Sequence, residues 1–243
     1  MAIVMLFTAL AAGAPAEASL TRNPAGAKNI GEAGGLTLDT AGEFERDSDG
    51  RTWTFGPGLQ YQAADRLQIL AETVLYQRVR PDEGEAASGF GDTDLTLSWL
   101  AAAEHGARPS AVLGARVKLP TAGDAIGTGE ADYAALLVLG KESGELEVAL
   151  ELEYGIFGSP PGEQLDNQFL YTLTGEYGLT GFMAVYAELF GHSAPSAAES
   201  RTDAGLIGVE LDVQASPWAA PYVSLELDTE GATTARAGVE WNW

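Results

Sequence analysis

The sequence predicts an all-β protein, an antiparallel transmembrane β-barrel of about 12 strands with an up-and-down meander topology. Three observations predict it. Segments of alternating polarity have the length of about 9–11 residues that a tilted membrane strand needs. The connections between them alternate between long and short, and aromatic side chains gather near the segment ends. The barrel is expected to span residues 34–243 of the 243-residue chain.

The segment from Glu145 to Phe157 displays the alternation most clearly. Its large apolar residues occupy every second position, and Glu147, Glu151 and Glu153 lie between them. Side chains of a strand alternate between two faces, whereas a helix turns by about 100° per residue and would mix the two sets. The segment is therefore predicted to be a strand with one apolar and one acidic face. A soluble sandwich would turn the apolar face into its core, and a membrane barrel would turn it toward lipid.

The chain begins with a stretch that resembles a secretory signal peptide, residues 1–18. Ala2 to Ala12 is almost wholly apolar, and Ala16 to Ala18 has the small-any-small pattern of a cleavage site, although no Lys or Arg precedes the apolar run. The alternative, a transmembrane anchor, needs about 20 apolar residues, and too few precede Glu17. Residues 19–33 are expected to form an irregular lead-in.

The alternating segments then follow one another to the end of the chain, and each is expected to form one barrel strand. They are Leu36–Phe44, Thr52–Gln62, Arg66–Arg80, Phe90–Leu100, Ser110–Pro120, Ala131–Gly140, Leu146–Phe157, Gln168–Tyr177, Phe182–His192, Ala204–Gln214, Ala220–Asp228 and Thr233–Trp243. An even number of strands fits a single-chain bacterial barrel with both ends on the same side.

The connections provide a second test, because outer-membrane barrels have short periplasmic turns and longer external loops. The expected external loops are Glu45–Arg51, Pro81–Gly89, Thr121–Glu130, Ser159–Asn167 and Ser193–Asp203. The expected periplasmic turns are Ala64–Asp65, Lys141–Glu145, Gly178–Gly181 and Ala215–Ala219. Two connections depart from the pattern: Ala101–Arg108 is long for a turn, and Thr229–Ala232 is short for a loop.

Aromatic residues are expected in two girdles, because Trp and Tyr favour the membrane interfaces. The predicted girdle residues are Trp53, Tyr133, Tyr154 and Tyr171 at the external rim, and Trp99, Tyr177, Trp241 and Trp243 at the periplasmic rim. Ala237, Val239, Trp241 and Trp243 are also spaced by two at the end of the chain. This resembles the C-terminal signature of outer-membrane barrels, which implies recognition by the barrel-assembly machinery.

Charged residues are expected inside the barrel. The predicted lumen-lining residues are Asp92, Asp94, Arg116, Lys118, Glu147, Glu151, Glu153, Glu176, Glu188, Glu210, Arg236 and Glu240, and Arg78 and Arg80 are expected to accompany them. Two interpretations stay open: a salt-bridged interior that only holds the barrel's shape, and a water-filled path whose negative field favours cations. The net charge of -22 also makes nucleic acid an unfavourable partner.

Catalysis and metal binding are not expected. Outer-membrane phospholipase barrels use His, Ser and Asn on the rim, and His192 and Ser193 lie together here without a fitting Asn. His105 lies in a periplasmic turn. Acidic residues of the external loops, such as Asp47 with Asp49, lack the spacing of a calcium-binding loop and are interpreted as solvated. No cofactor is expected.

Two stretches resemble a known family. They run from Gly89 to Leu95 and from Lys118 through Gly127 to Tyr133. They are similar to the MetA-pathway phenol-degradation family of outer-membrane transporter-like β-barrels, with looser likeness up to Phe190. The resemblance implies an outer-membrane barrel that passes small, often hydrophobic or aromatic molecules.

The leading interpretation is therefore a bacterial outer-membrane channel or transporter for small solutes, without enzymatic activity. Its expected partners are the lipid bilayer and lipopolysaccharide, the barrel-assembly machinery and a small-molecule solute. One alternative is a plugged structural or surface barrel. Another, from a different class, is a soluble β-barrel that binds a ligand in its core.

Overall fold

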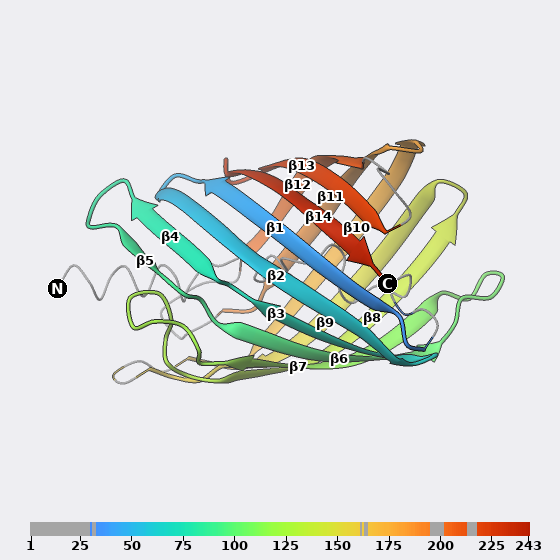
Figure 1. The fold of residues 1–243 in the computed structure, drawn as a ribbon, viewed down its shortest axis with the longest axis horizontal. Helices are drawn as coiled ribbons and strands as arrows, with labels where there is room; N and C mark the ends of the chain where they lie inside the picture. The colour runs from blue at the N-terminus through green and yellow to red at the C-terminus, as the bar shows by residue number, and fades with distance from the viewer. Residues whose placement is uncertain (1–29, 31–32, 161, 163–164, 195–201, 213–217) are drawn as a thin grey trace.

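The computed structural model describes residues 30, 33–160, 162, 165–194, 202–212 and 218–243. The predicted signal peptide and most of the lead-in lie outside these residues. The described part of the chain contains no helix long and apolar enough to cross a membrane. Its strands form one antiparallel sheet that closes on itself (Figure 1). They are β1 Leu36–Arg46, β2 Gly50–Ala64, β3 Leu67–Thr73, β4 Tyr76–Pro81, β5 Ala87–Gly89, β6 Thr93–Ala102, β7 Ser110–Leu119, β8 Asp132–Ser143, β9 Leu146–Ile156, β10 Gln168–Thr180, β11 Met183–His192, β12 Thr202–Asp212, β13 Ala219–Asp228 and β14 Thr233–Asn242.

The closed sheet is a twelve-stranded meander, because two of its strands are each interrupted once. β2 pairs with β3 along one half and with β4 along the other, so β3 and β4 are two parts of one barrel strand. β5 pairs with β4 and β6 pairs with β3, so β5 and β6 are likewise parts of one strand. The ring closes where β1 pairs with both β2 and β14. The predicted fold class is confirmed.

The break between β3 and β4 reverses which side chains face inward. Ile69 and Ala71 share the outward face with the neighbouring Tyr61 and Leu59, and the odd-numbered residues of β3 point outward. After Val74 and Leu75 the parity changes: Tyr76 pairs with the exposed Phe55. The even-numbered residues of β4 therefore point outward.

The prediction that Arg78 and Arg80 face the lumen is accordingly wrong. Arg78 is the cross-strand partner of Trp53, which is 53% exposed, and both arginines lie on the outer face. The error arises because residues 66–80 were expected to form one unbroken strand, and an irregularity of one residue moves every later side chain to the other face.

Elsewhere the two faces separate as the alternation predicts. Leu97, Leu113 and Leu225 on the outside are 46–52% exposed, whereas Leu70, Ser98 and Val112 on the inside are at most 2% exposed. A soluble barrel would bury its large apolar side chains, so the alternative of a soluble ligand-binding protein is rejected.

Apart from residues 103–109, the described connections at the end of the barrel where β14 ends are short, as for the turn of Gly144 (φ 64°) and Glu145 between β8 and β9. At the other end, the connections from β7 to β8 and from β9 to β10 are long. The charged loop expected at Glu45–Arg51 is instead a tight turn, because the Asp47 carboxylate accepts hydrogen bonds from the backbone N–H groups of Asp49 and Gly50, both at 2.7 Å.

One apolar cluster lies inside the barrel near the short-turn end. Ile30, Val112 and Val138 are buried together, and Leu100 packs against them. Val112 and Val138 are cross-strand partners on the inward face of β7 and β8. Ile30 therefore touches the inner wall.

Candidate functional site: the inward face of the barrel

The structure places twelve of the charged residues predicted to line the lumen on the inward face, whereas Arg78 and Arg80 lie outside. Cross-strand partners share a face, and the register joins each predicted residue to a chain of inward neighbours. These residues are Asp94, Arg116, Lys118, Glu147, Glu151, Glu153, Glu176, Glu188, Glu210, Arg236 and Glu240 in the strands, with Asp92 in the break between β5 and β6. The face brings together residues from every part of the described barrel.

Two arginines on this face are paired with glutamates. Arg116 donates to Glu153 Oε1 at 2.6 Å, and only 4% of the Glu153 side chain is exposed. Arg236 donates to Glu43 Oε2 through Nη2 at 2.7 Å and through Nε at 3.1 Å. A carboxylate so buried would be costly without a cationic partner, so both pairs stabilise the wall in its present form.

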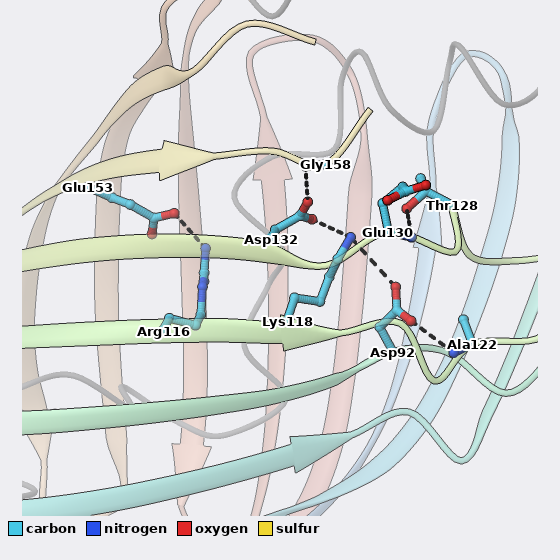
Figure 2. A network of polar contacts seen from close by, with 9 residues as sticks. All are labelled: Asp92, Arg116, Lys118, Ala122, Thr128, Glu130, Asp132, Glu153 and Gly158. Atoms are coloured by element: carbon cyan, nitrogen blue, oxygen red, sulfur yellow. Dashed lines mark hydrogen bonds and ion pairs between the residues drawn. The ribbon is translucent and has the colours of Figure 1, made fainter. Parts of the chain in front are cut away.

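Lys118 joins two carboxylates at the loop end of β7, as Figure 2 shows. Its Nζ lies 2.5 Å from Asp132 Oδ2 and 3.6 Å from Asp92 Oδ2. Each carboxylate also accepts a backbone hydrogen bond through its other oxygen, Asp92 from Ala122 N and Asp132 from Gly158 N, both at 2.8 Å. We call Lys118, Asp92 and Asp132 the lysine clamp.

The loop of residues 120–131 folds onto the inner wall beside the clamp. Gly123 N donates to Phe90 O at 3.0 Å, and Ile126 is 8% exposed. A Cβ atom added at Gly89 would lie 3.3 Å from Ile126 Cγ1. Gly89 pairs with Gln77 on the inward face of β4, so Ile126 covers the inner side of β5.

Two inward tyrosines complete the site, and the sequence reasoning missed both. Tyr222 donates to Asp39 at 3.0–3.2 Å, and Tyr186 donates to Glu226 Oε1 at 2.6 Å. Each ring lies over its cross-strand glycine: a Cβ atom added at Gly208 would overlap the Tyr186 ring, and one at Gly238 would be 2.6 Å from the Tyr222 ring. The sequence alone does not show which glycine lies opposite each tyrosine, because this depends on the strand register.

Carboxylates exceed cations on the inward face of the described strands. The inward cations of these strands are Arg116, Lys118 and Arg236, and all three are ion-paired. The inward acids are Asp39, Glu43, Glu45, Glu72, Asp94, Asp132, Glu142, Glu147, Glu151, Glu153, Glu176, Glu188, Glu210, Asp212, Glu226, Asp228 and Glu240. Acidic side chains therefore outnumber basic ones on this face.

The predicted girdle residues lie toward the strand ends on the outer face. Trp53 is paired near the β1–β2 turn, and Tyr133 and Tyr154 lie near the long loops, whereas Trp99 and Tyr177 lie near the short turns. Tyr171 donates to Asp203 at 2.7 Å, Trp241 stacks on Trp218 at 5.9 Å, and Trp243 is 66% exposed.

His192 and Ser193 form no catalytic arrangement with each other. The His192 ring nitrogen Nδ1 lies 3.0 Å from the Ser193 carbonyl oxygen, and the Ser193 hydroxyl oxygen accepts a hydrogen bond from Phe169 N at 3.0 Å. A nucleophile needs a base within reach of its own hydroxyl. Among the described residues, no group of three or more His, Asp or Glu side chains is arranged to hold a metal ion.

The closed ring, its apolar exterior and its charged interior define an outer-membrane β-barrel. The chain belongs to the family described as "Putative MetA-pathway of phenol degradation", whose model matches residues 72–239. None of the curated proteins matches the chain.

Several solved structures share the fold at low sequence identity. The COG4313 outer membrane channel from Pseudomonas putida F1 is 13% identical, with a TM-score of 0.70, over 87% of this chain and 96% of that one. The NanC porin is 11% identical, with a TM-score of 0.60, over 84% and 98%. The KdgM porin is 14% identical, with a TM-score of 0.57, over 85% and 99%.

Proposed function

We propose that the protein is an outer-membrane channel for small solutes, with an acidic lumen that favours cations over anions. The excess of carboxylates on the inward face carries this proposal. Low-dielectric walls concentrate the field of such groups in an enclosed path, so cations are attracted and anions repelled. The channels and porins of the same fold, and membership in a family described by phenol degradation, support passage of small molecules, including hydrophobic or aromatic ones.

Planar-bilayer recording tests this function. The purified barrel should conduct in KCl, and a KCl gradient should give a reversal potential of the sign for cation preference. Glu151→Lys should move that potential toward anions, because it reverses one charge on the inward face. An absence of conductance with any ion would favour the alternative of a plugged structural barrel, and anion preference in the wild type would contradict an acidic path.

A liposome-swelling panel addresses the solute. Vesicles containing the barrel should swell in small cationic and neutral solutes, including phenol-type aromatics, faster than in anionic solutes of equal size. Protein-free vesicles give the baseline, which matters because aromatic molecules cross lipid unaided. Equal rates with and without protein would remove the aromatic class from the proposal.

We also propose two partners besides the bilayer lipids. The β14 strand together with the Trp243 that follows it, in which Val239, Trp241 and Trp243 are spaced by two, is the segment that the barrel-assembly machinery would recognise. Lipopolysaccharide is the expected neighbour of the outer face at the long-loop end, where Trp53, Arg78 and Arg80 lie. Exposed arginines suit the phosphate groups of such a lipid.

A further inference from the structure

We propose that residues 121–127 are the size-selecting constriction at the external mouth, and that Lys118 is the positioning residue that holds this segment on the inner wall. The proposal rests on the channel function above and names the residues that set its solute limit. Its structural half, that Lys118 fixes the segment, can be tested without conduction.

The first observation is the place of the segment. Ile126 covers the inward side of β5, and its burial against Gly89 removes an apolar side chain from water at the mouth. Two backbone hydrogen bonds to Gly123 O, from Ile126 N at 2.8 Å and Gly127 N at 3.0 Å, close the segment into a compact turn. A compact turn on the inner wall takes up space at the mouth, and this is the basis for proposing it as the constriction.

The second observation is how few contacts hold the segment to the barrel. Ala122 N is bound to Asp92 Oδ1, Gly123 N to Phe90 O, and the Thr121 hydroxyl to Thr93 Oγ1 at 3.0 Å. Asp92 has the only charged side chain among these partners. Its carboxylate is oriented by Lys118, whose own side chain is 12% exposed, as is that of Asp92. The hydrogen bond from Ala122 N to the Asp92 carboxylate is charge-assisted and therefore stronger than the neutral ones. The Lys118 ammonium group, 3.6 Å from the other Asp92 oxygen, holds this carboxylate in place, so Lys118 fastens the segment through Asp92.

The third observation is that the same ammonium group reaches a second external loop. Asp132 accepts from Gly158 N, and a Cβ atom added at Gly158 would be 2.5 Å from Glu130 Cβ. The start of the 157–167 loop therefore packs on the end of the 120–131 loop. Loss of Lys118 would leave both Asp92 and Asp132 without this cation and would loosen both contacts (Figure 2).

A disulfide trap measures the position of the segment directly. The chain has no cysteine, so Gly89→Cys with Ile126→Cys introduces one pair, and the ordinary backbone at Gly89 accepts a side chain. In the folded, detergent-solubilised barrel this pair should oxidise rapidly. Adding Lys118→Met should slow oxidation by about tenfold, because Asp92 is then no longer held in place to accept the hydrogen bond from Ala122 N, and the loss of one hydrogen bond to a charged group has this magnitude. Lys118→Arg should restore the rate.

Arg116→Met is the matched control, because it removes the same charge from the same face of β7 while leaving the clamp intact. It should shift the reversal potential, as Lys118→Met does, but leave the oxidation rate unchanged. In bilayers, only Lys118→Met should raise the conductance and admit larger solutes. In the Lys118→Met variant that carries the cysteine pair, oxidation of this pair should return the conductance and the solute size limit to their wild-type values.

Several outcomes would overturn the proposal. Failure of the cysteine pair to form would mean that Ile126 does not cover β5, and an unchanged oxidation rate in Lys118→Met would mean that Lys118 is not the fastener. A lowered rate with unchanged solute limit would mean that the segment does not form the constriction. If Lys118→Met fails to fold, Asp92→Ala removes the contact from the other partner. If the wild type never conducts while oxidation still depends on Lys118, the channel function fails and the fastening role stands.

Discussion

At the scale of single residues, the two faces of β9 make opposite predictions for neighbouring positions. Leu150 lies outward between Leu139 and Leu173, whereas Glu151 lies inward. Leu150→Lys places a charge against hydrocarbon near the middle of the strand and should cost about 2–4 kcal/mol of folding free energy. Glu151→Lys should change ion selectivity with little loss of stability. Urea unfolding in lipid vesicles measures the stability of both variants. Equal losses of stability would mean that the faces are misassigned.

Gly238 makes a second prediction at this scale. A Cβ atom there would overlap the Tyr222 ring at 2.6 Å, so Gly238→Ala must displace the ring and weaken its bond to Asp39. We expect a loss of roughly 1–3 kcal/mol, as for other overpacked sites. Gly175→Ala is the control, because nothing lies within 4 Å of its added Cβ. Similar stability of the two variants would contradict the close packing of ring and glycine.

Glu104 provides a pH-dependent prediction outside the membrane-spanning strands. A hydrogen bond from Lys141 lowers the pKa of the Glu104 carboxyl group below its ordinary value, and the backbone N–H of Glu142 adds to the effect. A carboxyl group whose pKa is lower in the folded than in the unfolded state stabilises the fold at pH values above its unfolded-state pKa. This stabilisation is lost as the pH falls through the folded-state pKa. The urea midpoint of the wild type should thus exceed that of Glu104→Gln at neutral pH, and the difference, small because the pair is exposed, should vanish in acid. A difference that persists in acid would assign it to another cause.

At the scale of elements, β14 both closes the ring and ends the chain. It pairs with β1 over Thr37–Arg46 and with β13, so it is one of the two strands at which the barrel closes. Trp241 adds its stack on Trp218, whereas the Trp243 side chain is 66% exposed and only its backbone pairs with Leu36. Trp243→Ala keeps these backbone hydrogen bonds and should therefore leave folding in detergent unchanged but lower the yield of protein in the outer membrane. Trp241→Ala should impair both, and normal membrane yield of Trp243→Ala would argue against recognition of Trp243 by the assembly machinery.

The interrupted strands are the elements that sequence reasoning predicted least well. Residues 66–80 read as one alternating run, but Val74 N bonds to Asp92 O and Leu75 N bonds to Phe55 O, so the chain shifts register there. The same shift places Arg78 and Arg80 outside. No local pattern in residues 66–80 marks the break. Val74 packs so closely on Gly91 that a Cβ atom added there would lie 2.7 Å from the valine side chain, and this approach depends on the neighbouring strand.

At the scale of the whole molecule, the sequence by itself determined the fold class and the facing of nearly every strand. Alternation is a local property, because the polarity of each side chain indicates the face on which it lies. A closed ring of strands in lipid places the apolar residues outside and the carboxylates inside. Only the tertiary structure decided which side chains meet. Arg236 with Glu43 and Tyr222 with Asp39 are separated by 193 and 183 residues, and Lys118 joins two loops that no periodicity describes. Such contacts depend on strand register and loop path, which are set by packing across the barrel and not by any one segment.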